Sequence, residues 1–227
     1  VNSYFNQTFK VLADGQAYAL QCVPTQSTVF AKNAHQQLPQ VLAALNKSQH
    51  KQWYPHLYLE MMATKDGDYY VPSQLHDQDV ELRLFKWINS TPIEKVTESI
   101  AFEAGKILAD FHLSVQSVTG LNDLVEQAIE PLPHFHDSAW YLLYWQQAVM
   151  QNQWADTSLN LTEHLATIEQ GIDLIQQFDI FRQQQLVQQP RVMHGDPKLA
   201  NILFSQQQAV ALIDFDTIMS GLWHYDV

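Results

Sequence analysis

Apolar positions follow two different periods along the chain, and the change comes near residue 90. Before it, alternating apolar and polar residues predict short β-strands, with Gly15 marking a turn between the first two. After it, apolar residues such as Ile100, Ile107 and Phe111 share one helical face, which predicts long helices until Pro190. The predicted strands are 4–11, 17–23, 57–63, 68–71, 80–86, 191–194, 201–204 and 209–215, and the predicted helices are 31–45, 92–113, 138–152 and 161–184.

The order of these elements predicts an α+β fold of two lobes. Residues 1–88 form a small β-rich lobe, a five-stranded sheet with one helix that Pro39 is expected to bend or split. Residues 89–227 form a larger helical lobe that ends in a β-rich segment. Thr91 and Glu94 match a capping box with Pro92 at the first helical position, so we expect the boundary and the helix start there.

Composition narrows the class of protein. The 227 residues are 46% hydrophobic and 16% charged, which is typical of a globular chain. The longest apolar run, residues 139–145, is far shorter than the ~20 residues of a membrane span, so a membrane protein is not expected. The single Cys22 and the lack of a secretory segment favour a cytoplasmic location. Because the chain opens on Val1 rather than Met, we expect a piece of a longer protein, truncated at both ends.

The net charge of −12 bears on the partners. Nucleic-acid binding depends on a basic face, so we expect no nucleic-acid partner. Residues 1–90 are neutral overall and residues 91–227 carry the whole excess of acid. This asymmetry agrees with two regions that have different surfaces.

Three polar residues stand among apolar ones in the segment 192–217. Asp196 and Asn201 are five positions apart, and Asp214 follows thirteen later. A strand, a loop and a returning hairpin would bring all three to one end of the strands. Asp196 could then accept a proton from a substrate hydroxyl while Asn201 and Asp214 hold Mg²⁺, which prefers oxygen ligands. This arrangement is suited to phosphoryl transfer, and Lys198 could reach the transferring group.

The same segment resembles the kinase-like phosphotransferases of small molecules, the superfamily of aminoglycoside phosphotransferases and choline kinases. Residues 194–201, HGDPKLAN, are similar to its catalytic loop H-x-D-x-x-x-x-N, and residues 213–216, IDFD, are similar to its metal-binding I-D-x-D. Shorter stretches are most similar to the N-acetylhexosamine kinase-like branch. They are 6–11, 18–21, 29–30, 135–137 and 214–221.

The resemblance implies a protein-kinase-like fold with ATP between the lobes. The implied reaction is the ATP- and Mg²⁺-dependent phosphorylation of a hydroxyl on a small molecule. A sugar or amino sugar is the expected acceptor, and an aminoglycoside, choline or a similar amino alcohol is the alternative. The implied site residues are Asp196 and Lys198 for catalysis, Asn201, Asp214 and Asp216 for metal, Gln21, Phe85, Lys86, Trp87 and Ile88 for ATP, and His134, His136 and Asp137 for the acceptor.

Departures from the kinase pattern leave two other readings open. Gln21 stands where a kinase-like lobe carries Lys, and the helix 31–45 has no acidic residue to pair with one. A catalytically inactive kinase fold that serves as a binding module would explain both losses. The histidines at 134 and 136, together with HGD and DFD, would suit a dinuclear metallohydrolase. We expect His194 to have a structural role in the loop.

Overall fold

The computed structural model describes residues 6–25, 32–48, 58–127, 134–151, 162–185 and 190–227. They divide into two compact units, one formed by residues 1–132 and 190–227 and the other by residues 133–189. Each unit is described by itself. The predicted lobe boundary after residue 88 stays a prediction.

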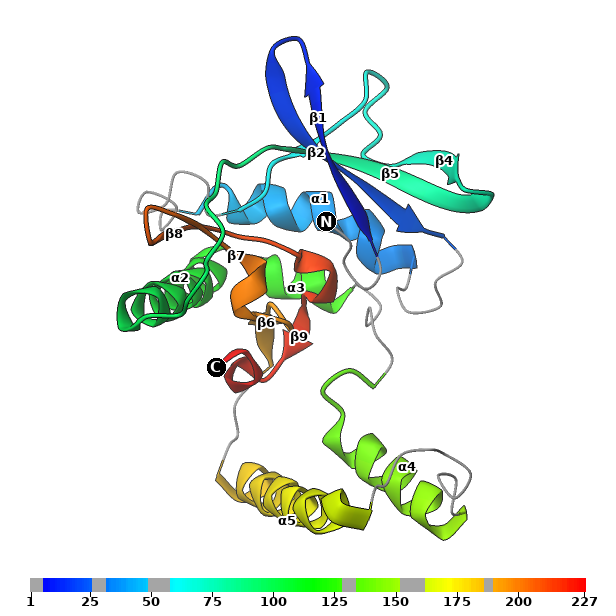
Figure 1. Cartoon of the computed structure of the whole chain (residues 1–227), viewed down its shortest axis with the longest axis vertical. Helices are drawn as coiled ribbons and strands as arrows, with labels where there is room; N and C mark the ends of the chain where they lie inside the picture. The colour runs from blue at the N-terminus through cyan, green and yellow to red at the C-terminus, as the bar shows by residue number, and fades with distance from the viewer. Residues whose placement is uncertain (1–5, 26–31, 49–57, 128–133, 152–161, 186–189) are drawn as a thin grey trace. The chain divides into compact units, whose positions relative to one another are not determined.

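A five-stranded antiparallel sheet opens the first unit, with strand order β1-β2-β5-β3, and β4 pairs with a different stretch of β5 from β3 (Figure 1). Asp14 and Gly15 both have positive φ, 50° and 75°, and this tight turn makes the predicted hairpin of β1 and β2. The predicted five-stranded sheet is therefore confirmed. The strands are β1 (Gln7–Ala13), β2 (Gln16–Pro24), β3 (Met61–Met62), β4 (Val71–Leu75) and β5 (Gln78–Lys86).

One predicted strand of this sheet was misplaced. The sequence turn 65–68 suggested a strand at 68–71 that follows the strand 57–63 directly. The structure instead places β4 at Val71–Leu75, joined to β5 by His76 and Asp77, which both have positive φ. His76 and Asp77 are polar residues that tolerate a left-handed backbone, so they can form this turn. The alternation of apolar and polar residues did not by itself show which turn borders β4.

Helix α1 (Lys32–Leu45) lies under this sheet (Figure 1). Pro39 stands inside the helix and does not divide it. Leu38, Leu42 and Leu45 are buried and belong to the same core as residues of the helices and strands that follow. Packing of this face outweighs the hydrogen bond that a proline removes from a helix.

Helix α2 (Glu98–Ser117) begins six residues later than the sequence suggested. Thr97, not Thr91, is its N-cap, and its hydroxyl accepts the N–H of Ile100 at 3.3 Å. The backbone N–H of Thr91 donates to the carbonyl of Phe204 at 2.7 Å. The predicted capping box at 91–94 was therefore wrong, because a tertiary hydrogen bond takes the segment out of the helix.

The chain returns to the first unit in two short antiparallel ladders. Strands β7 and β8 form the predicted hairpin. Strand β6 pairs with β9, a strand that the sequence analysis did not predict. A short helix, α3, was also missed. These elements are α3 (Leu121–Glu126), β6 (Arg191–Met193), η2 (Leu199–Asn201), β7 (Ile202–Ser205), β8 (Gln208–Leu212), η3 (Phe215–Thr217), β9 (Met219–Gly221) and η4 (Trp223–Asp226).

Aromatic packing joins α2 to the C-terminal segment. Phe111 is fully buried, and its ring centroid lies 5.9 Å from that of Phe215 and 6.1 Å from that of His194. Tyr58 contacts Phe111 and Phe215 edge to face. The segment around Phe215 is therefore part of the hydrophobic core.

The second unit holds the helices α4 (Ser138–Gln151) and α5 (Thr162–Gln185), within one residue of the predicted bounds. None of the helices that the structure describes combines the length and the apolar content that a bilayer crossing requires.

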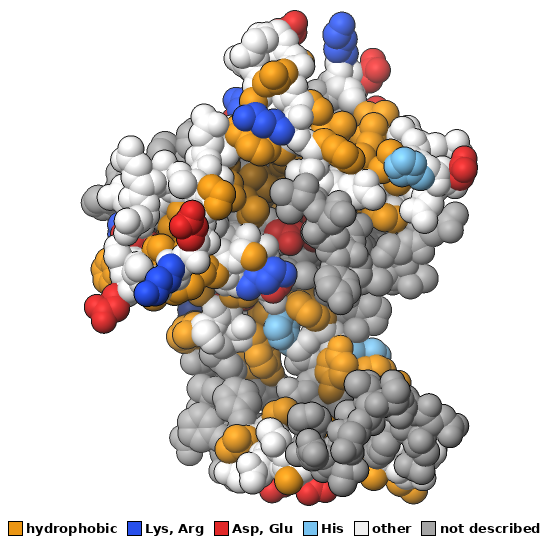
Figure 2. All heavy atoms as spheres, in the orientation of Figure 1, with side chains coloured by type: hydrophobic (Ala, Val, Ile, Leu, Met, Phe, Trp, Pro, Cys, Tyr) orange, Lys and Arg blue, Asp and Glu red, His pale blue; other side chains and the backbone are white. Residues whose placement is uncertain are grey.

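The face shown in Figure 2 carries scattered side chains of both charges over the first sheet, with apolar side chains between them. The first sheet therefore presents no basic surface in this view.

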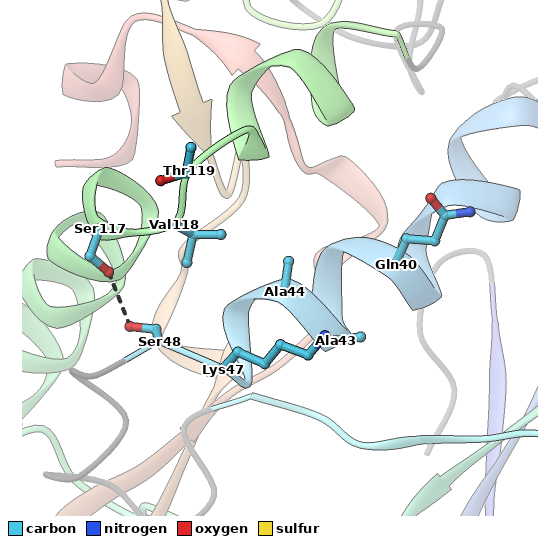
Figure 3. A pocket seen from close by; sticks show the side chains of 8 residues that line it. All are labelled: Gln40, Ala43, Ala44, Lys47, Ser48, Ser117, Val118 and Thr119. Carbon is cyan, nitrogen blue, oxygen red and sulfur yellow. Dashed lines mark hydrogen bonds between the residues drawn. The ribbon is translucent and has the colours of Figure 1, made fainter.

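A pocket of about 740 Å³ opens between the C-terminal ends of α1 and α2 (Figure 3). Small and polar side chains line it, and the hydroxyls of Ser48 and Ser117 lie 3.4 Å apart at its edge. None of the predicted site residues lines this pocket. Its lining residues are Gln40, Ala43, Ala44, Lys47, Ser48, Ser117, Val118 and Thr119.

The two threonines before α2 offer a direct test of the observed helix start. Thr97→Ala should lower the free energy of unfolding by about 0.5–2 kcal/mol, the usual cost of losing an N-cap hydroxyl. Thr91→Ala should change it by less than about 0.5 kcal/mol, because Thr91 is exposed and only its backbone is hydrogen-bonded. Urea denaturation of both variants measures the difference. Equal losses, or a larger loss at Thr91, would contradict this helix start.

Candidate active site

The catalytic-loop residues predicted from the sequence lie together. The amide nitrogen of Asn201 donates to the backbone carbonyl of Asp196 at 2.9 Å and lies 3.3 Å from the Asp196 carboxylate. The ammonium group of Lys198 contacts the same carboxylate oxygen at 2.5 Å. Because the nitrogen of the Asn201 amide faces Asp196, its oxygen is the atom that could ligate a cation.

The β7–β8 hairpin brings Asp214 to this loop. Ile202 pairs with Leu212, and one step further the N–H of Ile213 donates to the carbonyl of Asn201 at 2.9 Å. Asp214 follows at the mouth of the hairpin in a left-handed conformation, with φ 66°. The strand pairing thus explains how the chain returns, thirteen positions later, to bring Asp214 to the end where Asn201 lies.

The environment of Asp214 disfavours its charge. Burial raises the pKa of this carboxyl to about 6, and the charge of Asp216 adds to the effect, while Arg83 and Lys198 oppose it. The Asp214 carboxylate and the Asn201 amide oxygen are both oxygen donors, the type of ligand that suits a hard divalent cation such as Mg²⁺. A bound cation would favour the ionised form of Asp214.

His194 has the structural role expected of it. The ring is fully buried, its Nε2 lies 3.0 Å from the carbonyl of Ile213, and its Nδ1 lies 3.3 Å from the N–H of Asp196. These partners fit a neutral ring that donates from Nε2 and accepts at Nδ1, and burial lowers its pKa. His194 therefore ties the catalytic loop to the end of β8.

Asp226 is a site residue that the sequence reasoning missed. Its buried carboxylate accepts the N–H groups of His194 at 2.8 Å and Gly195 at 2.9 Å, and it lies 3.3 Å from Nε2 of His112. These hydrogen bonds lower its pKa despite the burial that opposes them. No spacing pattern connects this residue to the loop in the sequence, because the contact spans 31 residues of chain.

Asp216 is engaged by a cation of the first sheet. The guanidinium of Arg83 donates to both carboxylate oxygens of Asp216 at 2.6 Å, and the amide of Asn6 donates to one of them at 2.9 Å. The side chains of Arg83 and Asp216 are 2% and 5% exposed. No motif or spacing in the sequence singles out Arg83, which is one basic residue in an alternating strand.

The residues predicted to contact ATP lie on β2, on β5 and directly after β5. Gln21 accepts a hydrogen bond from Nε of Arg83 at 2.8 Å. Phe85 is buried within β5, so its side chain is part of the core. The N–H of Lys86 donates to the carbonyl of Glu60 and that of Trp87 to the carbonyl of Ala17, so both of these backbone donors are already used by neighbouring backbone.

The residues predicted to bind the acceptor lie in the second unit, at the start of α4. Asp137 caps this helix: one carboxylate oxygen accepts the N–H of Trp140 at 3.0 Å, and the other lies 3.3 Å from Nδ1 of His134. His134 and His136 both have positive φ, and the ring of His134 stacks on Trp140 at 4.3 Å. A helix cap thus accounts for the local sequence, and the acceptor role stays a prediction.

Nothing in the described part of the chain favours the metallohydrolase. No group of three or more His, Cys, Asp or Glu side chains among the described residues is placed to hold a metal ion. A kinase-type site needs fewer such ligands, because Asn and the nucleotide phosphates supply the other oxygens.

The sequence matches the phosphotransferase enzyme family, APH, over residues 3–227. The chain belongs to this family. No curated protein matches it. The APH match confirms the predicted superfamily and leaves the N-acetylhexosamine branch a prediction.

Solved structures share the fold of this APH-family chain at low sequence identity. Spectinomycin phosphotransferase APH(9)-Ia, crystallised with ADP and spectinomycin, has a TM-score of 0.59 and 11% identity over 99% of this chain and 64% of its own. Amicoumacin kinase hAmiN, in complex with AMP-PNP, Ca²⁺ and Ami, has a TM-score of 0.58 and 14% identity over 100% of this chain and 60% of its own. A microcompartment-associated aminopropanol kinase gives 0.56 and 18% over 99% and 65%. These likenesses confirm the kinase-like α+β fold, and the chain spans less than two thirds of the length of each of these three.

Gly195 in the catalytic loop should not tolerate a side chain. A Cβ there would lie 2.4 Å from the carbonyl oxygen of Thr217, and its φ is 86°. Gly120 is a matched control, with φ 79° and nothing within 4 Å of its Cβ. Gly120→Ala should cost about 1–2 kcal/mol of unfolding free energy from backbone strain alone. Gly195→Ala should cost more in the same denaturant titration, and an equal cost would show that the close contact is not maintained.

The raised pKa of Asp214 predicts a pH-dependent cost in stability. A carboxyl group with a pKa of about 6 when folded and about 4 when unfolded destabilises the fold once the pH exceeds 4, and the cost levels off above 6. Without divalent cations, Asp214→Asn should therefore raise the free energy of unfolding at pH 7 by roughly 1–3 kcal/mol and by nearly nothing at pH 4.

Denaturant titrations at pH 4, 5.5 and 7 measure this difference. Asp66→Asn, at an exposed turn position, is the control and should change the free energy by less than about 0.5 kcal/mol throughout. A gain for Asp214→Asn that is the same at every pH would contradict the assigned cause.

Proposed function

We propose that this protein is an ATP- and Mg²⁺-dependent phosphotransferase that phosphorylates a hydroxyl group of a small molecule. The observation that carries the proposal is the meeting of Asp196, Asn201 and the Asp214 end of the β7–β8 hairpin. The fold does not need a carboxylate at position 214 for its stability, because burial there disfavours the ionised form of Asp214. Membership of the APH family supports the same activity.

Asp196 is the residue that we assign to the acceptor hydroxyl. Its carboxylate accepts the hydroxyl proton as the acceptor oxygen bonds to the γ-phosphorus and the bond from that phosphorus to the ADP oxygen breaks. Asn201 holds this carboxylate through its amide nitrogen, and the loop backbone is fixed by His194 and Asp226. Lys198 places a positive charge beside it, where the charge of the transferring group would spread.

Asn201 and Asp214 are the residues that we assign to the cation. When bound, Mg²⁺ would neutralise the charge of the nucleotide phosphates. Asp214 would be ionised and Asn201 would turn its amide oxygen toward the cation. Asp216, predicted as a further ligand, is assigned instead to Arg83, which already occupies both of its oxygens.

The backbone hydrogen bonds of Lys86 and Trp87 move the expected adenine contact one or two residues further along the chain. The N–H groups of Lys86 and Trp87 are used within the sheet, so we assign the adenine contact to the backbone from Ile88 onward. Gln21, which bonds to Arg83, would face the phosphates as a neutral group and not as a cation.

We propose an amino sugar or an amino alcohol as the acceptor. The solved structures named above include a spectinomycin phosphotransferase and an aminopropanol kinase. The acidic excess of residues 91–227 suits an acceptor with a positive charge. The short stretches similar to the N-acetylhexosamine kinase-like branch favour a hexosamine within this class.

An ATP-consumption screen tests the proposed function. Hexosamines, N-acetylhexosamines, neutral hexoses, aminoglycosides, choline and aminopropanol are each supplied with ATP and Mg²⁺, and phosphorylated product is identified by mass. ATP-dependent product from one of them is expected. Absence of product together with absence of Mg²⁺-dependent nucleotide binding would favour the inactive binding module. Phosphate release without ATP would favour the hydrolase.

Asp196 provides the sharpest single variant for that assay. Asp196→Asn should lower kcat at least ~10²-fold, the lower range for a positioned general base, and leave the nucleotide affinity nearly unchanged. Asp66→Asn, at an exposed turn position of the first sheet, should leave kcat unchanged. Turnover of Asp196→Asn near the wild-type rate would remove this residue from the chemistry.

A further inference from the structure

A row of polar side chains crosses the first sheet and ends on the catalytic segment. Thr8, Gln21 and Arg83 are neighbours across β1, β2 and β5 in the strand register. The amide of Gln21 donates to the hydroxyl of Thr8 at 3.2 Å, and Nε of Arg83 donates to the Gln21 oxygen at 2.8 Å. Both ends of the Arg83 fork then donate to Asp216 at 2.6 Å.

The ion pair at the end of this row is both buried and two-pronged. Its partners are 2% and 5% exposed and 133 residues apart in sequence. Buried charges persist only with close partners, and a planar guanidinium that meets both oxygens of a carboxylate fixes its orientation as well as its position. Arg83 therefore determines where the short helix η3 lies against the sheet.

Asp214 precedes η3 and depends on this placement. It is the N-cap residue of η3 and has a left-handed backbone, so its side-chain direction follows from how Phe215, Asp216 and Thr217 are held. Asn6, directly before β1, donates a further hydrogen bond to Asp216. A loss of the Arg83 fork would release the turn that carries the proposed cation ligand.

We propose that Arg83 is a positioning residue of the phosphotransfer site. It acts through Asp216, whose carboxylate it holds, and so fixes the turn from which Asp214 reaches the divalent cation. This inference rests on the proposed function. The inference also gives a role to Gln21. Its neutral amide on β2 accepts a hydrogen bond from Arg83 on β5, and it does not compete with Arg83 for Asp216 as a second cation would.

Two Arg83 variants test the inference. Arg83→Lys keeps the charge but loses the fork, and the double variant Arg83→Met with Asp216→Asn leaves no unpaired buried charge. The Mg²⁺ concentration for half-maximal turnover should rise in both, by roughly 10–100-fold in the double variant and less in Arg83→Lys, with the acceptor KM unchanged. Val125→Ala, in the buried face of α3, is the control for lost stability and should lower Tm without changing the Mg²⁺ dependence.

Hydrogen exchange keeps the inference separate from the proposed function. The amides of residues 214–219 should exchange at least ~10-fold faster in the double variant than in the wild type, and should be unchanged in Val125→Ala, with no nucleotide present. A wild type without Mg²⁺-dependent nucleotide binding would overturn the proposed function and, with it, the role assigned to Arg83. An active wild type whose Arg83 variants show only a lower Tm, with unchanged Mg²⁺ dependence and unchanged exchange at 214–219, would overturn the inference alone.

Discussion

Buried charge is the constraint on which the catalytic segment depends. Asp216 and Asp226 are each at most 8% exposed, and a carboxylate removed from water is tolerated only when donors replace its hydration. Asp226 takes its donors from the backbone of the catalytic loop, and Asp216 takes them from Arg83 and Asn6. One carboxylate therefore fixes the loop, and the other fixes the turn that follows the hairpin.

The remaining contacts combine with these two anchors to form one site. His194 links the loop to the end of β8, and its ring lies on Phe215 with centroids 4.8 Å apart. Phe111 packs on both rings from α2. Polar anchoring and aromatic packing thus act on the same residues. The environment of Asp214, in contrast, disfavours its charge, and a bound cation would offset that cost.

Part of the predicted arrangement depends on short-range features. A loop of eight residues brings Asp196 and Asn201 together, and a hairpin of apolar strands returns the chain at Asp214 toward them. Distant partners, Asp226 for the loop and Arg83 for the turn, then hold both parts in place. The β1–β2 hairpin is also a local feature, because Asp14 and Gly15 form its turn. The error at Thr91 has the opposite origin, because its backbone is taken by Phe204, more than a hundred positions away.

The sequence by itself determined the family, the α+β class, the buried face of α2 and the identity of the loop residues, since periodicity and motif spacing are local properties of the chain. The tertiary structure alone decided that Asp216 pairs with Arg83, that Asp226 holds the loop and that the backbone N–H groups of Lys86 and Trp87 are used within the sheet. Two of these three are contacts of buried carboxylates with distant partners. A charge finds such partners only when the fold brings them near, and nothing in the spacing of residues along the chain records which ones they will be.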